Sequence, residues 1–455
     1  MIQNLKRIAT MSIAYRTLNQ TFNFVRNSIH QSFITKKLRS RIETRKTKID
    51  LKAVIHESLA FRIIKMIYAY LEKLHYKIYT IWANILPEIR WESWTIKHLM
   101  SPLIIVMTIL VFFSSAKTHF SGRTLTVIVG CSLSFIFGAI MGYKDSTTVV
   151  AEIKSKTVLK IGLAMLFIGY SAFIYQIRIA GGIPLFSEDV RRRLLPLYTM
   201  MSWSIVPGSL YTISSLKTSR NVEKKVNIRF KSLLILVPSL IAVILLAYRT
   251  EVVALLIGYL IVAYYLELVK FIEIGIAVIM SSLLYIGISV LRYWLIGVAF
   301  SPLQTVLIRN TVTCSNLDLL IEKFGIGGLT KGSLHWAVLS SMFRSLPGPK
   351  IAPRRIVAFL LRGTPYISMT STLYGPLIID FGLIGAIIIL LLYGFVVGLG
   401  YGLSMKPNCK PLLGPYSTIV AYTIVAVETG LLDLNVYIYI AISIAILLAS
   451  IKVHR

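Results

Sequence analysis

Three adjacent arginines, Arg191, Arg192 and Arg193, lie between two long apolar segments, in the stretch AGGIPLFSEDVRRRLLPLY at 180–198. The guanidinium group offers a rigid fork of hydrogen-bond donors that suits phosphate. Successive residues on a helical turn point about 100° apart, so the three side chains cannot all reach one ligand. We expect at least one of them to bind an anionic substrate. The alternative is that they bind only the phosphates of membrane lipids.

The residues before the arginines predict how these side chains are held. The pair Gly181 and Gly182 should end the preceding helix, and the Ile-Pro dipeptide that follows should be extended. Ser187 can then cap a short helical turn with Glu188 and Asp189 in its first positions. The arginines would follow on that turn, close to the membrane surface.

A second cationic site is predicted at Arg249. It lies with Glu251 in ILLAYRTEVVALLIGYL at 244–260, where one apolar segment ends and another begins with almost no loop between them. Ionisable residues held at such a place are candidates for function. The alternative is an interfacial arginine that reaches toward the head groups and pairs with Glu251.

A long polar segment at 292–375 adds further candidates. His335 is a candidate proton acceptor near neutral pH, although a lone histidine is more often structural. Asp380 begins the apolar segment that follows, and we expect it to pair with an arginine rather than to act as a base. Five arginines of the long segment add positive charge to it, Arg309, Arg344, Arg354, Arg355 and Arg362.

The elements that must position these residues are transmembrane helices. Of the 455 residues, 56% are apolar and 15% are charged, whereas soluble domains carry about 25% charged residues. The apolar runs are continuous rather than alternating, which indicates helices and not a β-barrel. The pattern predicts an all-α polytopic membrane protein with about ten spans, at 98–115, 124–142, 157–177, 195–216, 231–248, 252–268, 271–291, 376–402, 413–430 and 435–451.

Four regions follow from this pattern. They are a basic N-terminal region at 1–97, spans one to seven at 98–291, a large external loop with short helices at 292–375, and spans eight to ten at 376–455. The N-terminal region is expected to be an interfacial helix with a basic face, or a cytosolic tail with no specific partner. The loop is too long for a simple connector and is expected to be functional.

Basic residues in the short loops predict the orientation. With ten spans, the loop KTSRNVEKKVNIRFK at 217–231 falls on the same side as the N-terminal region, as Lys406 and Lys410, and as the C-terminal tail. Because basic short loops stay on the cytoplasmic side, both termini are predicted to be cytoplasmic. The three adjacent arginines then face outward, where topology does not favour them. An anionic ligand is the expected reason.

Several classes of function are disfavoured. The sequence has no P-loop, no H-E-x-x-H or G-x-S-x-G motif and no dinucleotide-binding fingerprint. The three scattered cysteines have no metal-ligand spacing and indicate no particular chemistry. We expect no metal and no other cofactor. The net charge of +30 follows membrane topology, so no nucleic-acid partner is expected. A transporter of anionic solutes or lipid-linked sugars is an alternative, but the spans show few charges and no repeat.

A family resemblance is carried by four motifs in order, AGGIPLFSEDVRRRL, YRTEVVALLIGYL, LPGPKIAPRRIVAFLLRG and TSTLYGPLIIDFGLIGAIIILLLYGFVVGLGYG. Their order and spacing resemble those of the oligosaccharide repeat-unit polymerases, the O-antigen polymerase (Wzy-type) family, in its archaeal or exopolysaccharide branch. The resemblance covers about residues 100–402. The long basic N-terminal region departs from the family's pattern.

The resemblance implies an integral-membrane glycosyltransferase of the GT-C kind in the cell membrane. Such an enzyme joins polyprenyl pyrophosphate-linked oligosaccharides on the outer face, among membrane lipids and other glycan-assembly membrane proteins, without a nucleotide sugar or a metal. A ligase that moves finished glycan to another acceptor is the alternative. The positions that match the family's pyrophosphate-gripping arginines are Arg191, Arg192, Arg193 and Arg249, followed by Arg309 and Arg362.

Elementary chemistry agrees with this reading. Arginines near the head-group plane would stabilise the negative charge that develops on a leaving pyrophosphate. A base must also take the proton of the acceptor hydroxyl. The candidates are Glu251, Glu188, Asp189 and His335, and the sequence does not choose between them.

Overall fold

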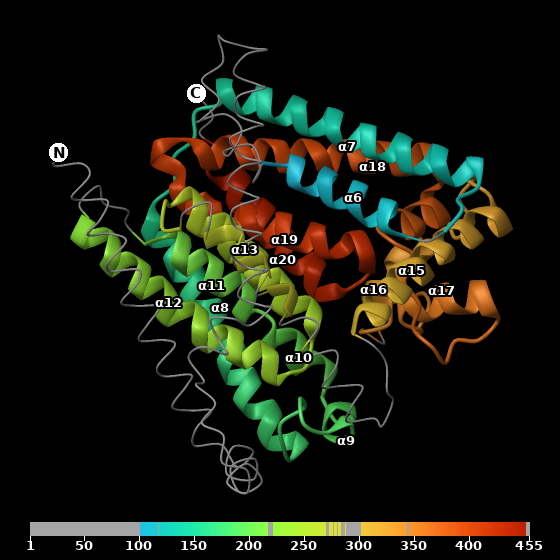
Figure 1. The fold of residues 1–455 in the computed structure, drawn as a ribbon, viewed down its shortest axis with the longest axis horizontal. Helices are drawn as coiled ribbons and strands as arrows, with labels where there is room; N and C mark the ends of the chain where they lie inside the picture. The colour runs from blue at the N-terminus through green and yellow to red at the C-terminus, as the bar shows by residue number, and fades with distance from the viewer. Residues whose placement is uncertain are drawn as a thin grey trace, which may run out of the picture. The chain divides into compact units, whose positions relative to one another are not determined.

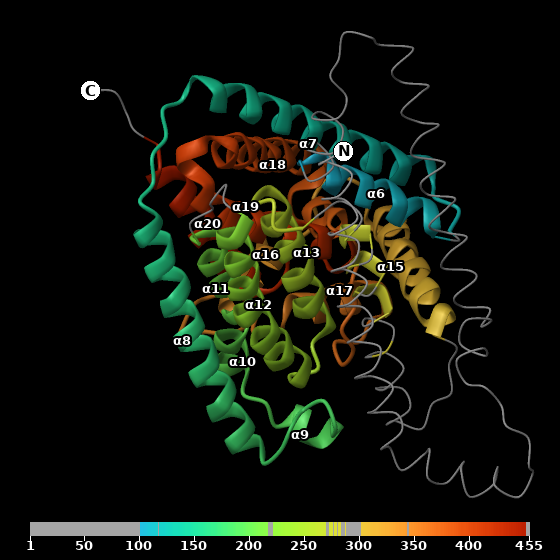
Figure 2. The same ribbon diagram turned by 60° about the vertical axis from the view of Figure 1, so that its left-hand side comes forward.

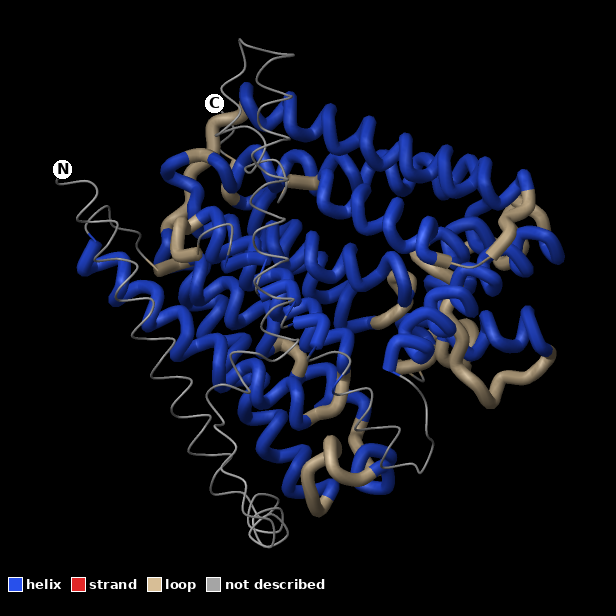
Figure 3. The backbone as a smooth tube through the Cα atoms, viewed as in Figure 1, coloured by secondary structure: helices blue, strands red, loops and turns tan. Residues whose placement is uncertain are grey.

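The computed structural model describes residues 101–116, 118–216, 222–269, 302–343 and 345–451, with parts of 273–287. The predicted N-terminal region at 1–97 lies outside the described residues, as does much of the predicted seventh span. The described residues belong to one compact unit, Glu92–Arg455. Among them every regular element is a helix and no strand occurs (Figure 3). The all-α prediction is therefore confirmed for this part of the chain.

Five helical stretches are long and apolar enough to cross a membrane, by length and composition. They are α7 (Gly122–Thr148), α8 (Ser155–Ala180), the Asn227–Leu245 part of α12 (Val222–Leu245), α18 (Tyr374–Met405), and η1 (Pro407–Leu412) continuing into α19 (Leu413–Thr429). Shorter apolar helices are α6 (Leu103–Ser115), α20 (Leu434–Ala449) and Glu273–Leu283. Several apolar helices are thus present, whereas the number of ten spans is not confirmed.

Helices α7 and α18 lie side by side (Figures 1 and 2). Each carries a pair of glycines four residues apart, Gly138 and Gly142 on α7 and Gly394 and Gly398 on α18. A Cβ atom at Gly142 would lie 2.0 Å from a main-chain carbonyl oxygen of α18, and one at Gly398 would lie 2.0 Å from a carbonyl oxygen of α7. The two backbones are therefore in direct contact, as small-residue motifs permit in membrane helices.

The end of α8 forms as the sequence predicts. The helix stops at Ala180, and Gly181 follows in the left-handed conformation with φ 73°. The side chain of Ser187 then accepts a hydrogen bond from the Val190 N–H at 3.4 Å and caps α9 (Glu188–Arg192). The two acidic residues of α9 occupy its first turn, and the arginines end it.

The predicted fourth span, 195–216, is two helices instead of one, α10 (Pro196–Ser202) and α11 (Ile205–Ser214). The break lies at Ser204, whose hydroxyl donates a 2.8 Å hydrogen bond to the Met165 carbonyl of α8. Trp203, at the same break, packs edge-on against Tyr248 with ring centroids 4.9 Å apart. Pro207 in the first turn of α11 accounts for the break, because a proline has no N–H to continue the hydrogen bonding from α10. The break places the Trp203 indole beside Tyr248.

The described residues of the predicted external loop, 302–343 and 345–375, form one long helix, α15 (Pro302–Phe324), and two short ones, α16 (Ser333–Ser340) and α17 (Pro353–Arg362), before α18 begins. A kink in α18 fixes the loop after α15. Gly382 has φ 69° inside α18, and the N–H of Leu383 donates to the Ile326 carbonyl at 2.9 Å. The segment is therefore anchored to α18 by main-chain hydrogen bonds.

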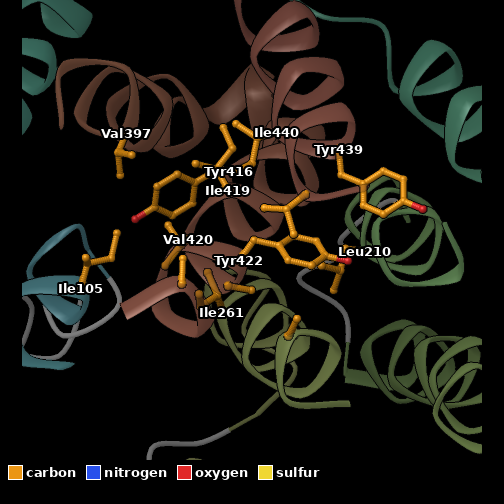
Figure 4. Packing of buried hydrophobic residues seen from close by; sticks show 14 of the residues in the cluster. Ile105, Leu210, Ile261, Val397, Tyr416, Ile419, Val420, Tyr422, Tyr439 and Ile440 are labelled. Carbon is orange, nitrogen blue, oxygen red and sulfur yellow. The ribbon is translucent and has the colours of Figure 1, made fainter. Parts of the chain in front are cut away.

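The core is built around α19, which packs against α11, α13 (Arg249–Tyr265), α18 and α20. Figure 4 shows Tyr416, Ile419, Val420 and Tyr422 of α19 among aliphatic side chains of the neighbouring helices. The Tyr422 ring lies 5.9 Å from the ring of Tyr439 on α20. This core supports the first turn of α13, where the site begins.

Candidate functional site

A cavity of about 670 Å³ brings together four arginines from four helices, α9, α13, α15 and α17. We call it the arginine cavity. Arg191, Arg249, Arg309 and Arg354 line it, and Glu428 is the acidic residue among its described lining residues. The remaining lining residues are Thr108, Phe112, Ala247, Tyr248, Thr250, Val253, Ser368, Ile424, Val425 and Val427. The excess of positive charge suits a ligand with more than one negative charge.

The start of α13 contributes to this cavity. Ala247 has φ 61°, so the chain reverses sharply after α12 and places Arg249 at the first position of α13. The helix has no side-chain cap, and its first residues line the cavity. Because the first N–H groups of a helix have no intrahelical partner, this end adds partial positive charge to that of the arginines.

Acidic partners fix three of the four arginines, Arg191, Arg309 and Arg354, and the partner of Arg191 is Glu188. Arg309 on α15 forms an ion pair with Glu428 at the end of α19. Arg354 pairs through Nη2 with Asp433, which precedes α20. Pro353 begins α17 and places Arg354 in its first turn. The pairs hold the guanidinium groups in place around the cavity.

The three adjacent arginines differ in their surroundings. Arg191 lines the cavity, has a side chain that is 23% exposed, and pairs with Glu188 at 2.9 Å. Arg192 is 75% exposed and lies 3.8 Å from the same carboxylate. Arg193 is exposed, and neither it nor Arg192 is among the residues that line the cavity. The structure thus brings one member of the cluster to the other arginines.

Glu251 lies behind the cavity wall. Its carboxylate is buried and accepts hydrogen bonds from the Tyr422 hydroxyl at 2.6 Å and from the Asn435 amide at 3.1 Å. These partners lie on α19 and α20, so Glu251 joins three helices. Its position supports the start of α13, on which Arg249 lies.

His335 lies apart from the arginine cavity and contacts Asp380. Its ring Nδ1 is hydrogen-bonded to a carboxylate oxygen of Asp380. The same carboxylate accepts the main-chain N–H groups of His335 at 2.7 Å and Leu334 at 3.0 Å, at the start of α16, and the hydroxyl of Thr330. The expected pairing of Asp380 with an arginine is therefore wrong. The carboxylate caps α16 instead, because the kink in α18 brings that helix start to it.

Arg362, the other arginine singled out from the sequence, ends α17 with an exposed side chain and does not line the cavity. Glu428 and Asp433 were not predicted from the sequence, and Arg354 was predicted only as one of several arginines of the long segment. The sequence around these three residues contains features that could have indicated them. Arg354 follows a proline that starts a helix, and the two carboxylates flank the short turn between the last two apolar segments.

Two further cavities adjoin the arginine cavity. The first, of about 480 Å³, lies between α6 and α15 and is mostly apolar; we call it the apolar groove. The second, of about 380 Å³, is lined by residues that include Trp203, Tyr248, Asn435 and Arg354; we call it the aromatic cavity. Each shares residues with the arginine cavity.

Comparisons with known proteins identify the family. Residues 98–440 match the family model described as "Putative O-antigen polymerase", a range that includes every lining residue of the arginine cavity. A relative, an uncharacterized protein of Methanocaldococcus jannaschii, is 28% identical over 278 residues, which cover 61% of this chain and 73% of the relative. No solved structure matches the chain. The apolar helices and the family match together indicate a multi-pass membrane protein, and the chain belongs to the O-antigen polymerase family.

Proposed function

We propose that this protein is a membrane glycosyltransferase that polymerises oligosaccharide repeat units carried on polyprenyl pyrophosphate at the outer membrane face. The observation that carries the proposal is the arginine cavity, where four guanidinium groups and the uncapped start of α13 converge. A pyrophosphate that links a lipid to a sugar carries two negative charges and many acceptor oxygens. Arginine forks and helix N-termini are the groups that proteins use for such ligands.

The apolar groove supports a lipid-linked donor. Thr108, Phe112, Arg309 and Glu428 line both the groove and the arginine cavity, so the two volumes adjoin. The rest of the groove is lined mainly by the apolar side chains of α6, including Met107, which is 55% exposed. An amphiphile with an apolar tail and an anionic head matches this arrangement.

The reaction requires one bond exchange. A hydroxyl oxygen of the acceptor glycan attacks the anomeric carbon of the donor, and the bond between that carbon and the pyrophosphate oxygen breaks. Polyprenyl pyrophosphate leaves with the electron pair. Arg191, Arg249 and Arg309 would stabilise its developing charge. The hydroxyl proton passes to a carboxylate, and Glu428 and Asp433, held by arginines at the cavity walls, are the residues that we assign to this step.

The test uses purified protein in lipid vesicles with native lipid-linked repeat units, and product length is read on a gel. Replacing Arg249 with alanine should lower the polymerisation rate at least about tenfold, since a hydrogen bond to a charged group contributes about 1.5–3 kcal/mol. Arg249→Lys should recover only part of the rate, because an ammonium group lacks the fork.

Arg178 supplies a matched control, because it is an exposed arginine in the last turn of α8 that does not line the cavity. Arg178→Ala should polymerise like the wild type. A normal polymer from Arg249→Ala would contradict the proposed role of the cavity. Transfer of glycan only to a foreign acceptor, with no growth of the repeat-unit chain, would identify a ligase instead.

A further inference from the structure

We propose that the aromatic cavity is a sugar-binding site that holds the glycan next to the pyrophosphate. The inference rests on the proposed function and names a part of the substrate that the arginine cavity does not explain. The two cavities share Arg191, Tyr248, Arg354 and Ser368. A ligand can therefore extend from one into the other.

Two residues that line this cavity carry a buried donor with no hydrogen-bond partner in the described part of the chain. The Trp203 Nε1 and the Arg354 Nε are both inaccessible to solvent, and neither has a hydrogen-bond partner in the described part of the chain. Both residues line the aromatic cavity. Buried donors without an acceptor are rare because they cost free energy. A shift of either side chain when a ligand binds would turn its donor to a ligand oxygen in the cavity.

The other lining residues favour hydroxyl groups as the source of that oxygen. Ser341, Asp433 and Asn435 offer acceptors and donors, and the Trp203 and Tyr248 rings meet at 80°. Sugars carry hydroxyl groups that donate and accept, and apolar ring faces that pack on aromatic side chains. Few polar groups placed among aromatic ones are typical of small-molecule sites.

The arrangement of the three cavities matches the order of groups in the substrate. The apolar groove and the aromatic cavity share no lining residue, but each shares four with the arginine cavity. The arginine cavity therefore lies between them. A donor runs from lipid through pyrophosphate to sugar, so a tail in the groove and a pyrophosphate on the arginines direct the sugar into the aromatic cavity.

The test compares two probes in vesicles, farnesyl pyrophosphate without sugar and the native lipid-linked glycan. Trp203→Phe keeps a ring but removes the N–H donor. It should weaken binding of the glycan probe about fivefold, the loss expected for one neutral hydrogen bond, and leave farnesyl pyrophosphate unaffected. Ser341→Trp fills the cavity from its other wall and should weaken binding of the glycan probe more than tenfold, with farnesyl pyrophosphate again unaffected.

Trp336→Phe is the control, because that indole N–H donates to the Pro347 carbonyl at 2.7 Å outside the three cavities. It should bind both probes like the wild type. The sugar site is refuted if both Trp203→Phe and Ser341→Trp bind the glycan probe normally, or weaken both probes equally. The proposed function fails separately, if the wild type binds neither probe or if Arg249→Ala binds both as tightly as the wild type.

Discussion

At the scale of single residues, the RRR sequence shows how position divides identical side chains. Arg191→Ala should lower the polymerisation rate about tenfold or more, because its side chain lines the arginine cavity. Arg192→Ala and Arg193→Ala should change the rate little, since exposed ion pairs contribute about 0–1 kcal/mol. Turnover of purified lipid-linked repeat units, at matched protein amounts, measures all three. If all three variants lose the same small part of the rate, the three arginines contribute only surface charge and none of them binds the substrate.

The sequence predicts which residues can bind an anion better than it predicts which residues contact each other in the fold. Arg191, Arg249 and Arg309 were singled out by residue type and by their place between apolar segments, and all three line one cavity. Arg354 was left among several arginines of the long segment, because only tertiary structure brings the start of α17 to Asp433. His335 could not be separated from a catalytic base, since its contact with Asp380 depends on the kink in α18.

At the scale of elements, the crossing of α7 and α18 depends on the absence of side chains. Gly142→Ala would place a Cβ 2.0 Å from the Phe395 carbonyl oxygen, and separating the helices should destabilise the protein by about 1–3 kcal/mol. Gly130→Ala, on the same helix, meets its nearest neighbour at 3.9 Å. It should be neutral or stabilising by up to about 1 kcal/mol, from helix propensity alone.

Thermal unfolding in detergent separates these two effects, because the substitution and the helix are the same and only the neighbour differs. If both variants unfold at the same temperature, α7 and α18 can move apart without a loss of stability, and the prediction is wrong. The glycine spacing is visible in the sequence, but the partner is not. Likewise, local signals predicted the stop at Gly181 and the cap at Ser187. The break before α11 was not predicted, although Pro207 in its first turn is a local signal for it.

At the scale of the whole molecule, apolar composition was sufficient for an all-helical membrane protein but not for the number of spans. Length and hydropathy select five helical stretches among the described residues. Others that were predicted as spans are shorter, such as α6 and α20, or divided, such as α10 and α11. A run of apolar residues does not fix where a helix breaks, because packing against neighbours decides it.

Helix α12 connects the arginine cavity to the most basic short stretch of the chain. α12 begins at Val222, inside the stretch 217–231 that was predicted as the most basic short loop, and ends at Leu245, just before Ala247 at the arginine cavity. A helix of 24 residues is roughly 36 Å long, so the basic loop and the cavity lie on opposite sides of a bilayer core if α12 spans it. The positive-inside rule then predicts that the cavity faces outward.

Cysteine labelling in intact cells tests this orientation. The native cysteines Cys131, Cys314 and Cys409 are buried, so background labelling by a membrane-impermeant maleimide should be low. Ser187→Cys and Lys331→Cys should react from outside, because the loops that carry them belong to the predicted outer face. Val222→Cys should react only after permeabilisation. Labelling of Val222→Cys in intact cells, with protection of the other two, would place the arginine cavity in the cytoplasm, where a glycan on the outer face could not reach it.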